Sequence, residues 1–340
     1  MPRSNSPLRV LPAARQPRGD AAPVLSIVVP VYNEAASLPA LRSSLERVLA
    51  SLDIDYELIL IDDGSGDATW AEIYAWHAAD ARVRAIRFVR NFGKEAALSA
   101  GLSQSRGAAV VLMDADLQHP PEIIAEFLAK WREGYEMVYA VRTSREGDSA
   151  LRRAATRAFY RLFGKIADVD LPPGAGDFRL IDRKVVDTLN RMPERLRFMK
   201  GLYAWAGCRH TGVPYAPPPR RHGQSAMSMR RLTGFGLDGI VAFSRVPLAI
   251  SGWIGAAIAL VAFVYGSYLA LRTLIVGVDV PGYASIMVGV MLLGGVQLLA
   301  LGVLGAYVGR IYEELKQRPL YVVAEELNAP AQAREMSPPA

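Results

Sequence analysis

The sequence of 340 residues contains one cysteine, Cys208, and four histidines. A lone cysteine excludes an intramolecular disulfide and a zinc site built from several cysteines. Scarce cysteine fits a reducing, cytoplasmic setting. The first residues also lack the apolar segment of a secretory signal peptide. We expect residues 1–23, which are rich in Pro, Arg and Ala, to form a disordered basic tail.

One common nucleotide-binding motif is absent as well, and another does not occur in the context that it requires. The chain has no G-x-x-x-x-G-K-[ST] sequence, and no G-x-G-x-x-G follows an apolar strand. A P-loop and a Rossmann dinucleotide site are therefore disfavoured.

The net charge is a modest +6, from 39 Lys and Arg against 33 Asp and Glu. Much of the basic excess falls between residues 142 and 245, directly before the most apolar part of the chain. A basic surface beside an apolar segment suits anionic lipid head groups at least as well as nucleic acid. We therefore expect a membrane partner and no nucleic acid.

Charged residues are missing from two long stretches, Val246–Leu271 and Tyr283–Gly309. Each is long enough to cross about 30 Å of hydrocarbon as a helix. Arginine and lysine flank their outer ends, whereas the connector at 272–282 holds little charge, so the positive-inside rule places both outer ends in the cytoplasm. Residues 227–245 mix apolar side chains with arginines, which predicts an interfacial amphipathic helix.

Before these stretches, short apolar runs alternate with segments of helical periodicity. This alternation predicts an α/β fold with a parallel-centred sheet flanked by helices. Strands are expected at 25–29 (ended by Pro30), 56–62, 83–89 and 108–116, and helices at 38–52, 69–79 and 94–105. The expected domains are a tail at 1–23, a cytoplasmic catalytic domain at 24–226, an interfacial helix at 227–245, transmembrane helices at 246–271 and 283–309 around an extracytoplasmic loop at 272–282, and a cytoplasmic segment at 310–340.

Three of the expected strands end in polar or acidic residues. Ligands of parallel α/β sheets bind beyond the carboxyl ends of the strands, so we expect these residues to line one crevice. They are Tyr32, Asn33 and Glu34 after the first strand, Asp62 and Asp63 after the second, and Asp114 and Asp116 after the fourth.

The stretch "DADLQHPP", residues 114–121, holds more carboxylates than a turn needs. Asp114 and Asp116 would lie on the same side of an extended chain, so that both reach one cation together with Gln118. Hard oxygen ligands favour Mg²⁺ or Mn²⁺ and leave room for substrate phosphates. Two aspartates that merely cap a turn are the alternative.

Asp62 and Asp63, which precede Gly-Ser-Gly, have two interpretations. They form an Asx turn, or one carboxylate accepts hydrogen bonds from a nucleobase or ribose. In the second case Tyr32 and Glu34 border the same nucleotide.

Several motifs together resemble family 2 glycosyltransferases of the GT-A fold. They are "VVPVYNE", "DDGSGD", "NFGKEAALSAG" and "DADLQHPPE". "GDFRLIDRKVV" and "RFMKGLYAWAG", followed by two membrane spans, resemble the polyprenyl-phosphate glycosyltransferases, which include the bactoprenol glucosyltransferases and, more distantly, the dolichol-phosphate mannose synthases. The resemblance extends over about Leu25 to Val323.

The resemblance implies a role for individual residues. The metal would be held by Asp114, Asp116 and Gln118, and the nucleotide by Pro30, Tyr32, Glu34, Asp62, Asp63, Asp114, Arg221 and Ser225. The acceptor phosphate would be bound by Arg142, Arg152 and Thr156, and a solvated helix face is the alternative for Arg152. Catalysis would fall to Asp116, Asp177 and Arg142, with Asp177 as a base or a sugar-orienting group.

Two positions depart from the family pattern. Ala226 ends "RRHGQSA" where relatives carry a lysine that closes over the diphosphate, so Arg230 would have to substitute or the loop closes less tightly. His119 stands where many relatives have aspartate, and we expect a histidine in a surface turn, with a ligand of the metal or a neighbour of its ligands as the alternative.

The resemblance also implies an activity: inverting transfer of a hexose, glucose from UDP-glucose, to undecaprenyl phosphate. The setting would be a bacterial plasma membrane, with both termini cytoplasmic and a homo-oligomer, a tetramer, as the assembly. Mannose or an amino sugar is the alternative. A processive polysaccharide synthase is disfavoured because the chain lacks its Gln-x-x-Arg-Trp stretch, and a non-catalytic membrane scaffold because the acidic strand ends are intact.

Overall fold

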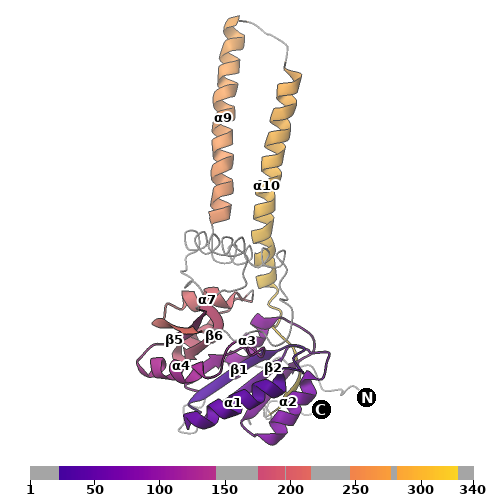
Figure 1. Ribbon diagram of the computed structural model, residues 1–340. Coiled ribbons are helices and arrows are strands. Elements are labelled where there is room, and N and C mark those ends of the chain that lie inside the picture. The colour runs from indigo at the N-terminus through magenta and orange to yellow at the C-terminus, as the bar shows by residue number, and fades with distance from the viewer. Residues whose placement is uncertain (1–22, 143–174, 196, 216–245, 277–281, 328–340) are drawn as a thin grey trace. The chain divides into compact units, whose positions relative to one another are not determined.

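The computed structural model describes residues 23–142, 175–195, 197–215, 246–276 and 282–327 (Figure 1). These residues fall into two compact units. One is an α/β unit and the other contains the two long apolar helices. The expected N-terminal tail and the expected interfacial helix at 227–245 lie outside the described residues.

A mixed sheet of eight strands, in the order β7-β5-β6-β4-β1-β2-β3-β8, forms the centre of the described α/β unit. Neighbours β4, β1, β2 and β3 are parallel, whereas β6 runs antiparallel to β4 and β5, and β8 antiparallel to β3. The expected parallel-centred sheet is confirmed. The strands are β1 Leu25–Val31, β2 Tyr56–Asp62, β3 Val83–Phe88, β4 Ala109–Leu112, β5 Met137–Arg142, β6 Ala175–Asp182, β7 His210–Tyr215 and β8 Val323–Leu327.

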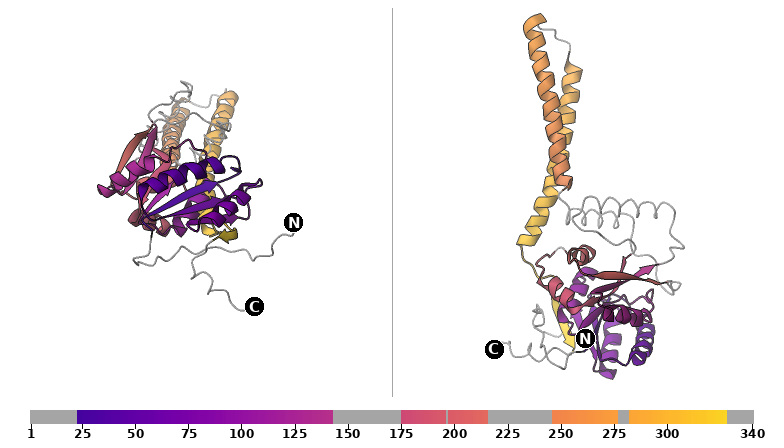
Figure 2. Two further views of the ribbon diagram at one scale, coloured as in Figure 1. Left: turned by 60° about the horizontal axis from the view of Figure 1, so that its bottom comes forward. Right: turned by 90° about the vertical axis from the view of Figure 1, so that its left-hand side faces the viewer.

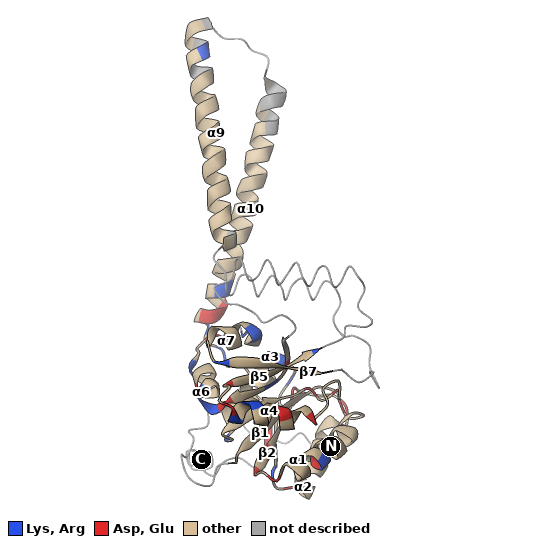
Figure 3. Cartoon of the chain, turned by 60° about the vertical axis from the view of Figure 1, so that its left-hand side comes forward, with Lys and Arg blue, Asp and Glu red and all other residues tan. Residues whose placement is uncertain are grey.

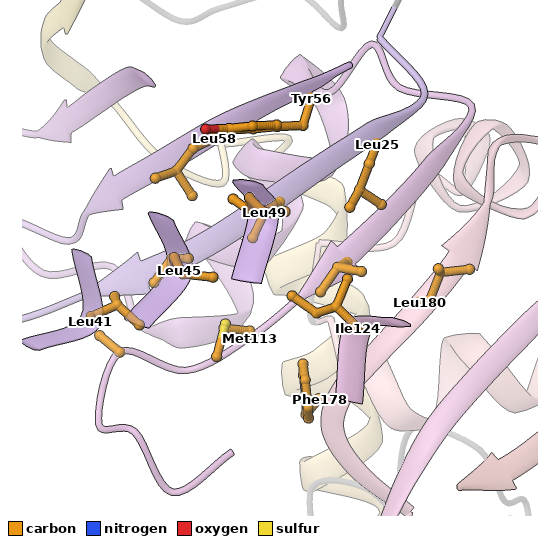
Figure 4. Close-up of a cluster of buried hydrophobic side chains, with 14 of the residues drawn as sticks. Leu25, Leu41, Leu45, Leu49, Tyr56, Leu58, Met113, Ile124, Phe178 and Leu180 are labelled. Atoms are coloured by element: carbon orange, nitrogen blue, oxygen red, sulfur yellow. The ribbon is translucent and has the colours of Figure 1, made fainter. Parts of the chain in front are cut away.

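Helices cover both faces of this sheet (Figures 1 and 2). Leu25, Ile27 and Val29 of β1 belong to a buried cluster that also includes residues of α1 and α4 (Figure 4). The alternate residue Val28 meets α3 instead, so close that a side chain on Gly101 would lie 2.1 Å from the Val28 Cγ1 atom. The helices are α1 Leu38–Leu52, α2 Thr69–Ala79, α3 Lys94–Gln104, α4 Ile123–Arg132, α6 Arg183–Arg191 and α7 Met199–Trp205.

Two strand boundaries differ from the sequence-based expectation. β1 continues through Pro30 to Val31, because its pairing with β4 ends at Val28 and a residue without an N–H group is tolerated beside the unpaired edge. β4 ends at Leu112, four residues before Asp116. The chain turns there, so the metal motif does not lie on an extended strand.

The chain that follows the apolar helices contributes a strand to the sheet. β8 pairs with β3, the Val89 N–H donates to the Val322 carbonyl (3.1 Å), and the Tyr321 ring stacks on Phe88 at 4.8 Å between centroids. From the sequence, residues 310–340 were expected to lie outside the catalytic domain. A strand as short as β8 has no clear signal of its own in the sequence and becomes evident only from its pairing with β3.

The second unit consists of α9, Val246–Val276, and α10, Tyr283–Leu315. Within them, Leu248–Tyr268 and Gly289–Leu315 are long and apolar enough to cross a membrane, by length and composition. Figure 3 shows almost no charged residues along the greater part of either helix. Both helices run a few residues beyond the apolar stretches expected from the sequence.

A buried polar network lies at the amino ends of β1 and β2, away from the strand ends that carry the predicted site. The Glu57 carboxylate accepts hydrogen bonds from the Ser26 hydroxyl (2.6 Å), the Arg84 guanidinium (2.8 Å) and both the backbone and side chain of Arg106. Burial by itself would raise the pKa of Glu57, but Arg84, Ser26 and Arg106 outweigh burial and lower it. A buried charge with this many partners serves stability.

Glu57→Gln should lower the free energy of unfolding by about 3–5 kcal/mol, because it removes the carboxylate charge that neutralises the buried Arg84 guanidinium. Since the folded-state pKa of Glu57 is depressed, its stabilisation is present above its usual pKa and is lost as the pH falls through the folded value. Denaturation of the detergent-solubilised protein against pH measures both effects. Glu46→Gln, at an exposed pair with Arg42, is the control and should change stability little. A Glu57→Gln protein as stable as the wild type would contradict this assignment.

Candidate functional site

The loops that follow β1 and β2 are joined by hydrogen bonds. The Asn33 N–H donates to the Ser65 hydroxyl (2.9 Å), and the Gly66 N–H donates to the Asn33 side-chain oxygen (2.9 Å). The Glu34 N–H donates to the Thr69 hydroxyl at 2.8 Å. The two loops predicted to hold the nucleotide therefore form one continuous wall. Beside it, Tyr32 is half exposed.

Asp62 and Asp63 are both buried and engaged within the protein. Asp62 Oδ1 accepts the Ser65 N–H at 2.9 Å, as in an Asx turn. The two oxygens of Asp63 accept the N–H groups of Phe92 (2.7 Å) and Gly93 (2.9 Å). Burial raises the pKa of both carboxyls. Asp63 thus fixes the loop before α3, and contact of either residue with a nucleotide stays a prediction.

Gly64 is the residue that allows this arrangement. Its φ is +71°, and a Cβ atom there would lie 2.4 Å from the Arg90 carbonyl carbon. Any other residue would both strain the backbone and collide with the chain leading to α3.

The segment after β4 folds into a tight turn around Leu117, whose φ is +56°. A positive φ is costly for leucine and is tolerated where the surroundings enforce it. The turn brings Gln118 back to Asp116, which accepts the Gln118 backbone N–H (3.1 Å) and side-chain amide (2.7 Å). The proximity expected of these two residues therefore arises from a turn. In addition, Arg142 at the end of β5 donates to the Gln118 side-chain oxygen at 3.4 Å.

Lys94, the first residue of α3, connects Asp114 with Asp177. Its ammonium nitrogen lies 2.6 Å from Asp114 Oδ1 and 2.8 Å from Asp177 Oδ2. Burial opposes the charge on Lys94, but the two carboxylates outweigh burial and hold the pKa of Lys94 above its usual value. The structure thus brings together the carboxyl end of β4 and strand β6.

Lys200, on α7, approaches Asp177 from another element. Its ammonium nitrogen lies 3.7 Å from Asp177 Oδ1. Burial by itself would raise the pKa of Asp177, but Lys94 and Lys200 outweigh it and hold the pKa well below the usual range. Sequence analysis assigned no role to either lysine. The available signal was their position inside "NFGKEAALSAG" and "RFMKGLYAWAG".

Behind these groups lies a layer of buried polar side chains. The Arg179 guanidinium carbon stands 3.9 Å from the ring centroid of Tyr203, which is buried. Next to Lys94, burial raises the pKa of Glu95 to about 7. Glu34, at the opposite wall, also has a pKa raised by burial, and the charges of Asp116 and Asp114 add to this effect. The crevice thus holds several carboxylates that benefit from cations.

Some of the expected residues are arranged differently or are not described. The His119 ring is not in an open surface turn, because it packs against Phe178 and Tyr215, with ring centroids 5.1 Å and 5.8 Å away. Partial burial there lowers its pKa. Arg152, Thr156, Arg221, Ser225, Ala226 and Arg230 lie outside the described residues.

The described residues offer few side chains that could bind a metal ion. Among the described residues, no group of three His, Cys, Asp or Glu side chains is arranged to hold a metal ion. Asp114, Asp116 and Gln118 nevertheless offer hard oxygen atoms, and the Lys94 ammonium on Asp114 shows that this carboxylate already attracts a cation. The residues present fit an ion such as Mg²⁺ or Mn²⁺ that keeps positions for phosphate oxygens.

Comparison with known proteins identifies the family. Residues 26–189 match the model of "Glycosyl transferase family 2". The chain is 48% identical over 301 residues to a glycosyltransferase of Synechocystis sp., covering 88% of this chain and 95% of that protein. It is 41% identical over 302 residues to the bactoprenol glucosyl transferase of Shigella phage SfV, covering 89% and 98%.

Among solved structures, the chain is similar to glucosyl-3-phosphoglycerate synthase of Mycobacterium tuberculosis. The TM-score is 0.44 with 20% identity, over 65% of this chain and 78% of that one. The assignment to a family rests on the identity and coverage of the sequence matches. The chain is a glycosyltransferase and belongs to glycosyl transferase family 2.

Proposed function

We propose that this glycosyltransferase moves a glucosyl group from UDP-glucose to a polyprenyl phosphate, undecaprenyl phosphate in a bacterial plasma membrane. The observation that carries the proposal is the 41% identity, over 88–89% of the chain, to proteins named as bactoprenol glucosyl transferases or homologues of them. The same lipid phosphate carrying mannose or an amino sugar remains the alternative, because none of the contacts described above distinguishes hexoses.

The nucleotide-sugar donor would bind along the wall formed by the loops after β1 and β2. Pro30, Tyr32, Glu34, Asp62 and Asp63 lie along this wall, and we retain them as the residues that bind or shape the nucleotide site. Asp114, Asp116 and Gln118 would hold Mg²⁺ or Mn²⁺, which neutralises the diphosphate leaving group when bound. This proposal is supported by the oxygen donors at the turn and by the pKa of Glu34, which burial raises and to which the charges of Asp116 and Asp114 add.

The acceptor half needs little acid–base chemistry. A phosphate monoester is already ionised at neutral pH, so an oxygen of the acceptor can attack the anomeric carbon directly. In one inverting step, the new bond from this carbon to the acceptor oxygen forms while its bond to the UDP oxygen breaks. What the protein must provide is alignment and cations. Arg142, beside Gln118, is proposed as one of these cations, together with Arg152 and Thr156.

We also propose that α9 and α10 both cross the membrane and that the catalytic domain and both termini are cytoplasmic. The support is topological: β8 follows α10 in the chain, yet it pairs with β3, which precedes α9. Chain on either side of the two helices therefore belongs to one sheet, so the number of crossings between them is even. A homo-oligomer, expected as a tetramer from the family resemblance, is part of the same proposal.

Asp116→Asn should reduce glucosyl transfer at least about a hundredfold, because the carboxylate charge is lost where a metal would stabilise the leaving group. Folding should be unaffected, since Asp116 is exposed. Transfer of radiolabelled glucose to lipid measures the rate, and titration of Mn²⁺ in the presence of UDP measures the site. Glu122→Gln, a nearby exposed carboxylate, is the control. More than about a tenth of wild-type turnover would remove Asp116 from the metal site.

Arg142→Ala should raise the acceptor KM and lower turnover while leaving the affinity for UDP almost unchanged. Loss of one charge-assisted contact costs about 1.5–3 kcal/mol, roughly ten- to hundredfold. Arg142→Lys should recover only part, because the planar guanidinium that engages two oxygens is lost. Steady-state kinetics with each substrate varied separates the effects. A loss confined to UDP binding would place Arg142 on the donor diphosphate instead.

A reporter fused after Ala340 tests the topology. A fluorescent protein that folds in the cytoplasm should be bright in this position, and alkaline phosphatase, which is active only outside the cytoplasm, should be inactive. Phosphatase inserted into the connector between α9 and α10 is the control and should be active. An active phosphatase after Ala340 would overturn the proposed orientation.

A further inference from the structure

Four charged side chains of alternating sign contact one another in sequence beside the candidate site. The order is Asp114, Lys94, Asp177 and Lys200, with separations of 2.6, 2.8 and 3.7 Å between the charged atoms. They come from the segment after β4, from α3, from β6 and from α7. Asp114 belongs to the proposed donor side. Lys200 is thus connected to the proposed donor side only through Asp177 and Lys94.

Lys94 and Lys200 differ in how closely they contact carboxylates. Lys94 contacts two carboxylates below 3 Å, so most of its hydrogen-bonding capacity is used. The ammonium group of Lys200 lies 3.7 Å from Asp177, which is longer than a hydrogen bond, and its charge also acts on Glu95. An ammonium group has three donors. Lys200 thus retains donors that its contact with Asp177 does not use.

The backbone of α7 is anchored while the Lys200 side chain stays accessible. Met199, Leu202 and Tyr203 are almost completely buried, whereas 32% of the Lys200 side chain is exposed. The contact with Asp177 places the Lys200 ammonium group close to Lys94, which itself contacts Asp114. An ammonium ion with unused donors, fixed on a buried helix, suits a phosphate group, for which lysine acts as a point charge.

We propose that Lys200 binds the phosphate of the acceptor lipid and that Asp177 is the positioning residue that holds Lys200 and Lys94 beside the reacting groups. This inference rests on the proposed function, since it assumes a phosphate acceptor. Each oxygen of Asp177 faces a different lysine, Oδ2 toward Lys94 and Oδ1 toward Lys200. A carboxylate paired in this way is a poor proton acceptor, and an ionised phosphate does not need one. The depressed pKa of Asp177 agrees with this role.

The alternative is that Lys200 only neutralises Asp177. The two roles differ in what Lys200→Met changes. Loss of a phosphate ligand weakens acceptor binding selectively, whereas loss of a neutralising charge changes turnover without selectivity for the phosphate.

The test measures binding of farnesyl phosphate and of farnesol to the full-length protein in detergent, without a donor. The wild type should bind the phosphate more tightly than the alcohol. Lys200→Met should weaken binding of farnesyl phosphate about ten- to hundredfold and leave farnesol unchanged. Lys200→Arg keeps the charge and should recover much of the affinity. Lys130→Met is the matched control, because Lys130 pairs with Glu133 on the exposed face of α4.

Transfer assays then complete the experiment. With UDP-glucose, Lys200→Met should raise the acceptor KM and leave the UDP affinity as in the wild type. A Lys200→Met protein that binds farnesyl phosphate within about twofold of the wild type would overturn the inference, and so would a loss confined to UDP binding. If the wild type itself does not distinguish farnesyl phosphate from farnesol, the proposed acceptor fails. The proposed function and the role of Lys200 are thus tested separately.

Discussion

The ammonium group of Lys94 joins two carboxylates that are far apart in the sequence, Asp114 and Asp177. Like-signed carboxylates at the end of a sheet repel each other, and a cation between them offsets this repulsion. The position of Lys94 depends on α3, which in turn depends on Asp63 and on Gly101. Asp63 holds the loop before the helix through the Phe92 and Gly93 N–H groups, and the absence of a side chain at Gly101 lets the helix approach β1. Much of the site's geometry follows from these contacts.

The two ends of the sheet use charge for opposite purposes. At the amino ends, Glu57 is almost completely buried and engaged by Ser26, Arg84 and Arg106, an arrangement that stabilises the fold. At the carboxyl ends, Asp114, Asp116 and Lys200 are partly exposed and incompletely engaged. Groups that retain exposure and hydrogen-bonding capacity can bind a substrate without first losing a partner. This difference separates the charges proposed to bind substrate from the structural ones.

Strand β8 links the fold of the α/β unit to the proposed membrane crossings of α9 and α10. The edge strand β3 would otherwise present unpaired backbone groups, and β8 covers them with residues from beyond the apolar helices. Tyr321, stacked on Phe88, adds an aromatic contact to the backbone pairing. The sheet is therefore completed by chain from both sides of α9 and α10, which supports the proposed even number of membrane crossings.

The sequence by itself determined the parallel-centred sheet, the acidic strand ends and the two apolar helices, because these depend on periodicity and composition within short windows. It also predicted α2 at Thr69–Ala79, as the structure has it. Only the tertiary structure decided which groups meet. Asp63 faces Phe92, Lys94 and Lys200 face Asp177, and His119 packs on Phe178. Each of these contacts joins separate elements. The turn that follows β4 depends on an unfavourable φ at Leu117, which no residue preference predicts. Local patterns record which face of an element is buried, whereas contacts between elements depend on how the whole sheet and its helices pack.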